Sequence, residues 1–305
     1  MTRREPWAAR INELAGTCAD AAGGVAVLPG GARLAIGHAD GTVRCVELAT
    51  GDTVWFGAER HAPVLQSLAC SPDGRLLATT GDDYTIRVWD AATGAVIGRH
   101  TIPAIAFELR FSPDSARLAT AGADDTAGVY QVDGGARLAS CTGHEAWVQS
   151  VDWSPRGDRL ASVSNDATLR IWDAAGGLEL ERRELGARAH GVAWSPSGSW
   201  LAVGLEGGEV VLLDAAGPFA EAHRLQVGPG SVDGLAWAPG GRALAIAGEH
   251  AVAIWEVGAG DAIARFPHDA PFAHRVAWAP DGTFIAASLC GDRVRLWETR
   301  AGAGA

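Results

Sequence analysis

The sequence predicts an all-β fold, in which seven four-stranded antiparallel sheets form one radial array over residues 1–305. The first observation is a short step ending in proline that recurs seven times, with 43, 41, 42, 41, 43 and 41 residues between successive prolines. The second is that no helical periodicity accompanies the repeat. Because the repeat covers nearly the whole chain, it excludes a division into two unrelated domains. The seven steps are Leu28-Pro29, Ser71-Pro72, Ser112-Pro113, Ser154-Pro155, Ser195-Pro196, Ala238-Pro239 and Ala279-Pro280.

The fourth repeat shows most clearly how each unit is built. VQSVDW (148–153), RLASVS (159–164) and TLRIWD (168–173) are expected strands, and turn residues separate them. A fourth short strand is expected before the next repeat. Because a single sheet cannot bury both of its faces, neighbouring units must stack on one another. The expected repeats cover approximately residues 17–60, 61–101, 102–143, 144–185, 186–227, 228–268 and 269–302.

A residue at a fixed place in the first strand of each unit is expected to pack between neighbouring sheets. It lies two positions before the proline, and it is usually large and apolar. Burying a side chain of this kind stabilises the fold by roughly 1.5–3 kcal/mol. We therefore assign these residues, tryptophans included, to the core. They are Val27, Cys70, Phe111, Trp153, Trp194, Trp237 and Trp278.

The two ends of the chain are expected to complete one sheet together. The seventh repeat stops soon after RVRLWE (293–298), its third strand, and so lacks an outer strand. By the repeat spacing, residues 10–15 fall where an outer strand belongs. The sequence therefore predicts that this segment pairs into the last sheet and closes the ring, which removes an open edge.

Composition excludes several functions and favours a location. Net charge is −11, and all 25 basic residues are arginine, so a phosphate-loop lysine and a Schiff-base lysine are absent. The acidic balance argues against a nucleic-acid partner. The absence of an 18-residue apolar run argues against a membrane span. The five cysteines form no C-x-x-C pair, and no secretory signal is visible, so we expect a cytoplasmic protein without a cofactor.

Two segments and one dipeptide resemble a known family. TIRVWDAATG (85–94), TLRIWDAAGG (168–177) and Gly143-His144 are similar to the WD-repeat (WD40) family, whose units run from a Gly-His pair to a Trp-Asp pair. The resemblance covers about residues 10–302. It implies a seven-bladed β-propeller that acts as an interaction platform and not as an enzyme.

The same resemblance implies a hydrogen-bonded tetrad within a blade. Its members are the Gly-His histidine, a Ser or Thr in the second strand, the turn Asp and the Trp. An Asp-His-Ser set also resembles a hydrolase triad, but recurrence at blade-defined offsets favours a structural role. The complete sets are His61, Thr79, Asp83 and Trp89 in the second repeat, and His144, Ser162, Asp166 and Trp172 in the fourth.

Other repeats depart from this pattern. The third keeps Thr120, Asp124 and Tyr130, but His100 is displaced by two positions, and the first keeps only Asp40. In the last three repeats, apolar residues replace the Ser or Thr, and the turn aspartate is lost. The replacements are Val203, Ile246 and Ala287 at the first position, and Gly207, His250 and Gly291 at the second.

A ring of residues six positions before each proline is expected to line the mouth of a central channel: Gly23, Gln66, Phe107, Gln149, His190, Asp233 and His274. In the family this narrow face is a frequent contact surface. Trp147 and Phe272 lie two residues before the ring, as does Arg188, and an exposed Trp is typical of an interface anchor. The alternative is that Trp147 folds down onto its own blade. We expect a protein or peptide to bind at Phe107, Trp147, Gln149, Arg188, His190, Asp233, Phe272 and His274.

A second hypothesis assigns a metal to His190, Asp233 and His274, because imidazole and carboxylate groups suit zinc or ferrous iron. The same residues also fit a hydrated, polar channel mouth. A third possibility is that the rims of the blades make the partner contacts. The sequence favours the non-catalytic scaffold, with the metal site as its alternative.

Overall fold

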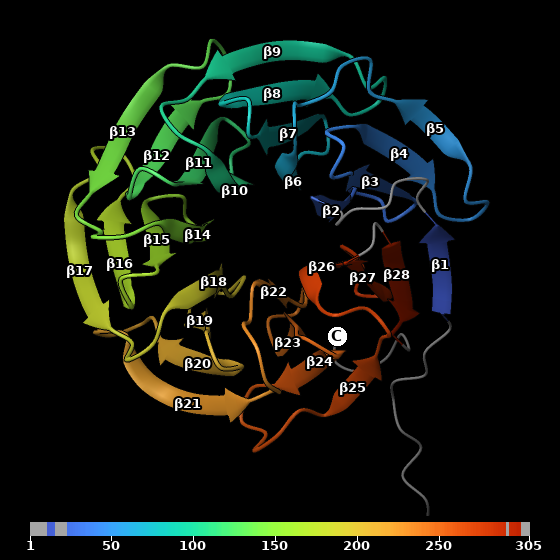
Figure 1. The fold of residues 1–305 in the computed structure, drawn as a ribbon. Helices are drawn as coiled ribbons and strands as arrows, with labels where there is room; N and C mark the ends of the chain where they lie inside the picture. Colours follow the sequence, from blue (N-terminus) through green and yellow to red (C-terminus); the bar gives the residue numbers. More distant parts are fainter. Residues whose placement is uncertain (1–10, 16–22, 291–292, 300–305) are drawn as a thin grey trace, which may run out of the picture.

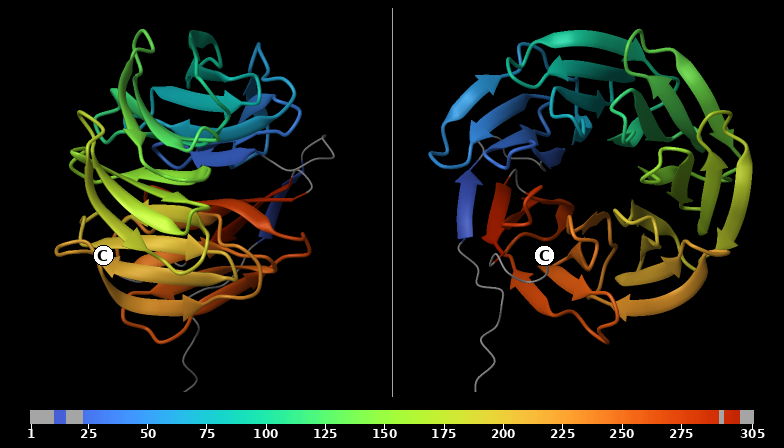
Figure 2. Two further views of the ribbon diagram at one scale, coloured as in Figure 1. Left: turned by 60° about the vertical axis from the view of Figure 1, so that its left-hand side comes forward. Right: turned by 180° about the vertical axis from the view of Figure 1, so that it is seen from behind.

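The computed structural model describes residues 11–15, 23–290 and 293–299, and the side chains only from residue 23 onward. Its 28 strands form seven four-stranded antiparallel sheets arranged around a central axis (Figure 1). The same closed arrangement is seen from behind in Figure 2. The described residues contain no helix that could span a membrane. The predicted all-β ring of seven sheets is confirmed.

Each sheet, or blade, runs from an innermost to an outermost strand. The innermost strands are β2 (Gly24–Val27), β6 (Leu65–Cys70), β10 (Ala106–Phe111), β14 (Val148–Trp153), β18 (Ala189–Trp194), β22 (Gly234–Trp237) and β26 (Ala273–Trp278). The second strands are β3 (Arg33–Gly37), β7 (Leu76–Gly81), β11 (Arg117–Gly122), β15 (Arg159–Ser164), β19 (Trp200–Leu205), β23 (Ala243–Ala247) and β27 (Phe284–Leu289). The third strands are β4 (Val43–Glu47), β8 (Thr85–Asp90), β12 (Thr126–Gln131), β16 (Thr168–Asp173), β20 (Glu209–Asp214), β24 (Ala251–Glu256) and β28 (Arg293–Glu298). The outer strands of blades 1 to 6 are β5 (Thr53–Phe56), β9 (Val96–Thr101), β13 (Arg137–Thr142), β17 (Glu179–Glu184), β21 (Ala220–Gln226) and β25 (Ala264–Pro267).

Blade 7 takes its outer strand from the other end of the chain. β1 (Ile11–Ala15) pairs antiparallel with β28, in a register that runs from Ile11 opposite Trp297 to Ala15 opposite Arg293. Figure 1 shows the blue β1 beside the red β28. The predicted closure is therefore confirmed, and it covers the backbone edge of the third strand of blade 7.

The aromatic residue at the end of the innermost strand joins neighbouring blades. Trp153 is 4% exposed and lies in one apolar cluster with Ala119 and Val129 of the preceding blade. In three blades the indole N–H also donates a hydrogen bond to the preceding innermost strand, so a buried polar group is satisfied. These bonds join Trp153 to Arg110 O at 3.1 Å, Trp237 to Ala193 O at 3.0 Å and Trp278 to Ala236 O at 2.9 Å.

The proline step forms the turn between the first and second strands. In blade 2 the Ser71 hydroxyl donates to Asp73 Oδ1 at 2.6 Å, and the N–H of Leu76 donates to Ser71 Oγ at 3.0 Å. Gly74 has a φ of 72°, which glycine adopts without a steric cost. Ser115 stands in the left-handed region in the equivalent turn of blade 3, with a φ of 61°.

Removal of residues 1–16 should expose the edge of β28 and destabilise the ring. Each lost backbone hydrogen bond costs about 0.5–1.5 kcal/mol, so we expect the Tm to fall by at least about 5 °C, with aggregation. Calorimetry and light scattering would measure both effects. A control lacking residues 1–9 keeps β1 and should behave like the full chain. An unchanged Tm in the longer deletion would contradict this role of β1.

Candidate functional site at the mouth of the central channel

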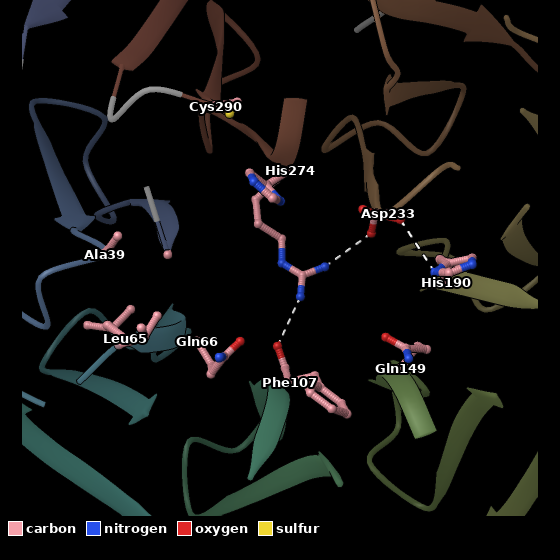
Figure 3. Close-up of a pocket in the computed structure, with 12 residues that line it drawn as sticks. Ala39, Leu65, Gln66, Phe107, Gln149, His190, Asp233, His274 and Cys290 are labelled. Carbon is pink, nitrogen blue, oxygen red and sulfur yellow. Dashed lines mark hydrogen bonds and ion pairs between the residues drawn. The ribbon is translucent and has the colours of Figure 1, made fainter. Parts of the chain in front are cut away.

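A funnel of about 570 Å³ opens on the face where the innermost strands begin. The structure brings all seven ring positions to this one cavity, so spacing from the proline places them correctly in space. Figure 3 labels the ring residues from Gln66 to His274 around its centre. The cavity is lined by Gly23, Ala39, Val64, Leu65, Gln66, Phe107, Gln149, His190, Asp233, His274, Arg275 and Cys290.

A β-bulge explains why these residues face the channel. In five blades the pairing of the innermost strand with the second strand shifts by one residue, and the residue at the shift is the ring residue. Bulges of this kind interrupt the ladder and redirect a side chain. In blades 1 and 6 the ring residue directly precedes the strand instead. The bulged residues are Gln66, Phe107, Gln149, His190 and His274.

Two aromatic side chains stand beside the funnel. Trp147 is 52% exposed, and its ring centroid lies 5.4 Å from that of Phe107 in the preceding blade. Trp147 thus contacts an aromatic side chain of the preceding blade. Phe272 is 37% exposed and meets the His274 ring edge-on at 4.5 Å. Arg188 is also exposed on this face. The structure therefore offers apolar contact area next to a polar cavity.

His190, Asp233 and His274 stand in consecutive blades, but they form no compact cluster. His190 Nδ1 lies 3.7 Å from Asp233 Oδ1, which is too long for a hydrogen bond. Nε2 of both histidines has no hydrogen-bond partner among the described residues. Burial lowers the pKa of His274, and Arg275 lowers it further, so this imidazole is neutral at pH 7. The Nε2 atoms of both histidines are buried in the wall of the funnel.

The metal hypothesis is not supported by this geometry. Within residues 11–15, 23–290 and 293–299, no group of three or more His, Cys, Asp or Glu side chains could hold a metal ion. In addition, Arg275 Nη1 donates to the main-chain oxygen of Asp233 at 3.1 Å, and a positive charge beside Asp233 disfavours a divalent cation there.

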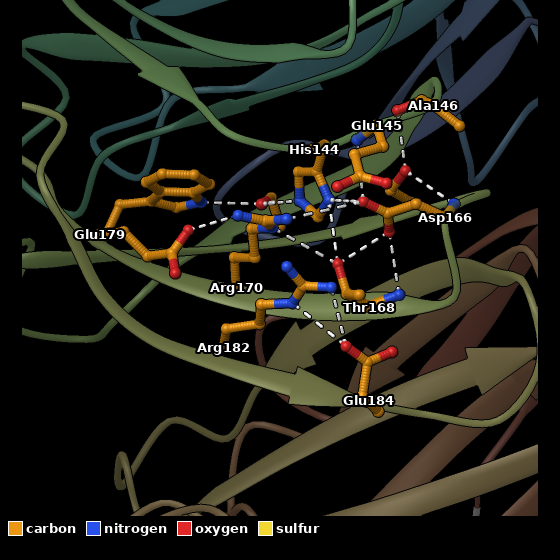
Figure 4. Close-up of polar contacts among 12 residues, drawn as sticks. His144, Glu145, Ala146, Asp166, Thr168, Arg170, Glu179, Arg182 and Glu184 are labelled. Carbon is orange, nitrogen blue, oxygen red and sulfur yellow. Dashed lines mark hydrogen bonds and ion pairs between the residues drawn. The ribbon is translucent and has the colours of Figure 1, made fainter.

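The histidine of blade 4 forms a buried hydrogen-bond chain (Figure 4). Trp172 Nε1 donates to Ser162 Oγ at 2.7 Å, so the Ser162 hydroxyl is left to donate to His144 Nε2 at 2.8 Å. His144 Nδ1 therefore carries the proton and donates to Asp166 Oδ2 at 2.8 Å. Ser162 is fully buried, which removes it from any substrate and leaves it a structural role.

Blade 2 repeats this chain with a threonine. Trp89 Nε1 donates to Thr79 Oγ1 at 2.9 Å, and Thr79 lies 2.7 Å from His61 Nε2. His61 Nδ1 lies 2.9 Å from Asp83 Oδ1. Two blades on the same side of the ring are thus braced internally.

Blades 3 and 5 to 7 lack the complete chain for identifiable reasons. In blade 3, buried Ile102 takes the place of the histidine, and His100 lies on the outer strand β9 opposite Ile86. In blades 5 to 7, Val203, Ile246 and Ala287 are fully buried apolar residues. Gly291, at the turn position of blade 7, lies outside the described residues.

Comparisons with known proteins agree with this architecture. The fold and its bracing define a seven-bladed β-propeller. Residues 58–90, 135–173 and 261–298 match the family model "WD domain, G-beta repeat", so the chain contains WD repeats.

Curated relatives share the repeats over part of their length. The chain is 40% identical over 157 residues to the WD repeat-containing protein SL1-17 of Schistosoma mansoni, covering 50% of each protein. It is 28% identical over 157 residues to Protein groucho of Drosophila melanogaster, covering 50% of this chain and 22% of the relative. It is 28% identical over 243 residues to Transcriptional corepressor LEUNIG_HOMOLOG of Arabidopsis thaliana, covering 79% of this chain and 25% of the relative. The chain thus spans between about a quarter and half of these relatives.

Ser162→Ala should destabilise the protein, because the N–H of Trp172 and the Nε2 of His144 both lose their buried partner. Leaving such groups unsatisfied costs about 1–3 kcal/mol. Denaturant unfolding would measure this loss. The exposed Ser199→Ala is the matched control and should change stability by less than about 0.5 kcal/mol. Equal stability of the two variants would contradict the bracing role.

The contribution of the Asp166 carboxylate to the stability of the folded protein should vanish in acid. Burial alone would raise the pKa of Asp166, but hydrogen bonds from Thr168, the Glu145 N–H and His144 lower it to about 2. A lowered pKa stabilises the folded state above the ordinary value of 3.8, and that contribution is lost as pH falls toward 2. Asp166→Asn should therefore be less stable than the wild type at pH 7, with the difference shrinking below about pH 4. A difference that stays constant from pH 7 to pH 2.5 would refute this linkage.

Proposed function

We propose that this chain is a non-catalytic scaffold that presents its narrow face and channel mouth to a protein or peptide partner. The observation that carries the proposal is the exposed Trp147, which packs against the half-buried Phe107 beside the 570 Å³ funnel. Tryptophan is enriched among residues that dominate binding energy, and it is most effective next to a pocket that excludes water. The proposed contact residues are Phe107, Trp147, Gln149, Arg188, His190, Asp233, Phe272 and His274.

The family supports a scaffold role. WD-repeat propellers bind protein partners, and the name of the Arabidopsis relative describes a transcriptional corepressor. The Asp-His-Ser/Thr hydrogen-bond chains stabilise blades 2 and 4 internally, so they do not support a hydrolase function. The two histidines of the funnel, His190 and His274, lie in separate blades.

Charge favours a basic segment in the partner. The chain carries a net charge of −11, which attracts basic peptides over long distances and repels nucleic acid. Asp233 adds a half-exposed carboxylate inside the funnel itself. A cytoplasmic location is part of the proposal, and it rests on the cysteine pattern and not on the structure.

The blade rims offer a second surface. Phe56 on β5 is 67% exposed, and Leu178 just before β17 is 68% exposed. These side chains lie on different blades and do not line the 570 Å³ funnel. The narrow face therefore remains the favoured surface, and the rim is the alternative that the experiment separates.

The variants Trp147→Ala and Asp233→Arg should fold normally and lose partner capture, singly in part and together by at least about tenfold. Quantitative affinity capture with mass spectrometry would compare them with the wild type. Phe56→Ala is the matched control, since it also removes an exposed aromatic side chain. Retention of the same partners by the double variant, with loss in Phe56→Ala, would assign binding to the rim.

A further inference from the structure

One side chain crosses the channel beneath the mouth. Arg275 belongs to β26 of blade 7, and its Nη2 donates to the main-chain oxygen of Phe107 in blade 3 at 3.1 Å. Its Nη1 donates to the main-chain oxygen of Asp233 in blade 6 at 3.1 Å. Blades 3 and 7 are not neighbours in the ring, and their innermost strands face each other across it (Figure 1). The close-up in Figure 3 shows both hydrogen bonds as dashed lines that reach Phe107 and Asp233.

The repeat itself shows that Arg275 departs from the pattern. It stands five residues before the proline, where most blades have glycine or serine and only blade 3 has another large side chain, Glu108. Arg275 Nη1 lies 3.6 Å from Glu108 Oε1, so the two exceptional residues of this position meet across the channel. Small residues elsewhere in the layer leave room for the arginine. The seven residues of the layer are Gly24, Ser67, Glu108, Ser150, Gly191, Gly234 and Arg275.

The two carbonyl groups that Arg275 contacts stand outside the regular ladder. Phe107 is the bulged residue of β10, and Asp233 directly precedes β22. Backbone oxygens in such places need another donor when water is restricted. The planar guanidinium can serve two acceptors at once, which an ammonium group does less well. The side chain of Arg275 is only 18% exposed, so these bonds are partly shielded from solvent.

The charge of the guanidinium is balanced deeper in the channel. Glu108 is 2% exposed at its side chain, and its Oε1 also lies 2.7 Å from Arg110 Nη2. A carboxylate this deeply buried requires partners, because an unpaired buried charge is strongly destabilising. Arg275 therefore belongs to a cross-channel network and is not an isolated surface cation.

We propose that Arg275 is a cross-channel strut, a positioning residue that holds the main chain of Phe107 and Asp233 at the mouth of the funnel. By holding the main chain of Phe107, it positions the aromatic side chain against which Trp147 packs. By holding the main chain of Asp233, it positions the carboxylate group in the funnel. The guanidinium group of Arg275 thus forms the floor of the funnel. The consequence for a partner rests on the narrow-face function proposed above, whereas the strut itself does not.

Hydrogen exchange of Arg275→Ala would test the strut without any partner. Amides of residues 104–110 in blade 3 should exchange about tenfold faster, although the substitution lies 168 residues from Phe107 in sequence. Methylguanidinium at millimolar concentration should restore their protection, because it can occupy the same acceptors. Arg188→Ala removes an exposed arginine from the same face and is the matched control, with no change expected in blade 3.

Two results would overturn the proposal. One is faster exchange confined to residues 273–289 of blade 7, and the other is faster exchange in blade 3 that methylguanidinium does not reverse. If Arg275→Ala does not fold, Arg275→Lys takes its place and should give intermediate protection at residues 104–110. Full protection in that variant would also reject the strut. Because none of these readouts needs a partner, they separate failure of the strut from failure of the narrow-face function.

Discussion

Stacking of one blade on the next is the constraint on which the whole molecule depends. A four-stranded sheet leaves two apolar faces, and only a neighbour on each side can cover both. A linear stack would end in two uncovered sheets, so the seven blades must close into a ring. The pairing of β1 with β28 completes the last blade from the opposite end of the chain. This closure makes the seven innermost strands converge on one channel and so creates the funnel.

Within this ring, the blades fill the same internal position by different means. Blades 2 and 4 bury a polar chain in which every donor finds an acceptor, whereas blades 5 to 7 fill the same place with Val203, Ile246 and Ala287. A complete chain is rigid, but the loss of one member leaves buried polar groups without partners. An apolar side chain has no such requirement, so the blades without the histidine remain well packed. The polar chains therefore mark internal bracing and no catalytic site.

The channel mouth combines two properties. The bulges turn ring side chains toward the axis, while Trp147 and Phe272 remain exposed beside them. Arg275 then links the ring residues of blades 3 and 6 by their main chains. A partner that binds here would meet apolar contact area at the edge and fixed polar groups in the centre. That combination suits selective recognition of a protruding segment.

The sequence alone determined the repeat number, the strand order within a blade, the closing segment and the identity of the seven ring positions. Each of these depends on local periodicity, which spacing from a proline records directly. Only the tertiary structure decided that Trp147 leans on Phe107, that His190, Asp233 and His274 do not gather as metal ligands, and that Arg275 reaches blade 3. No motif links Arg275 to Phe107, although its exceptional size in a layer of glycine and serine was a signal that sequence reasoning missed. Contacts across the axis join residues far apart in the chain, so they depend on how closure and the bulges orient each strand, and no period in the sequence encodes those directions.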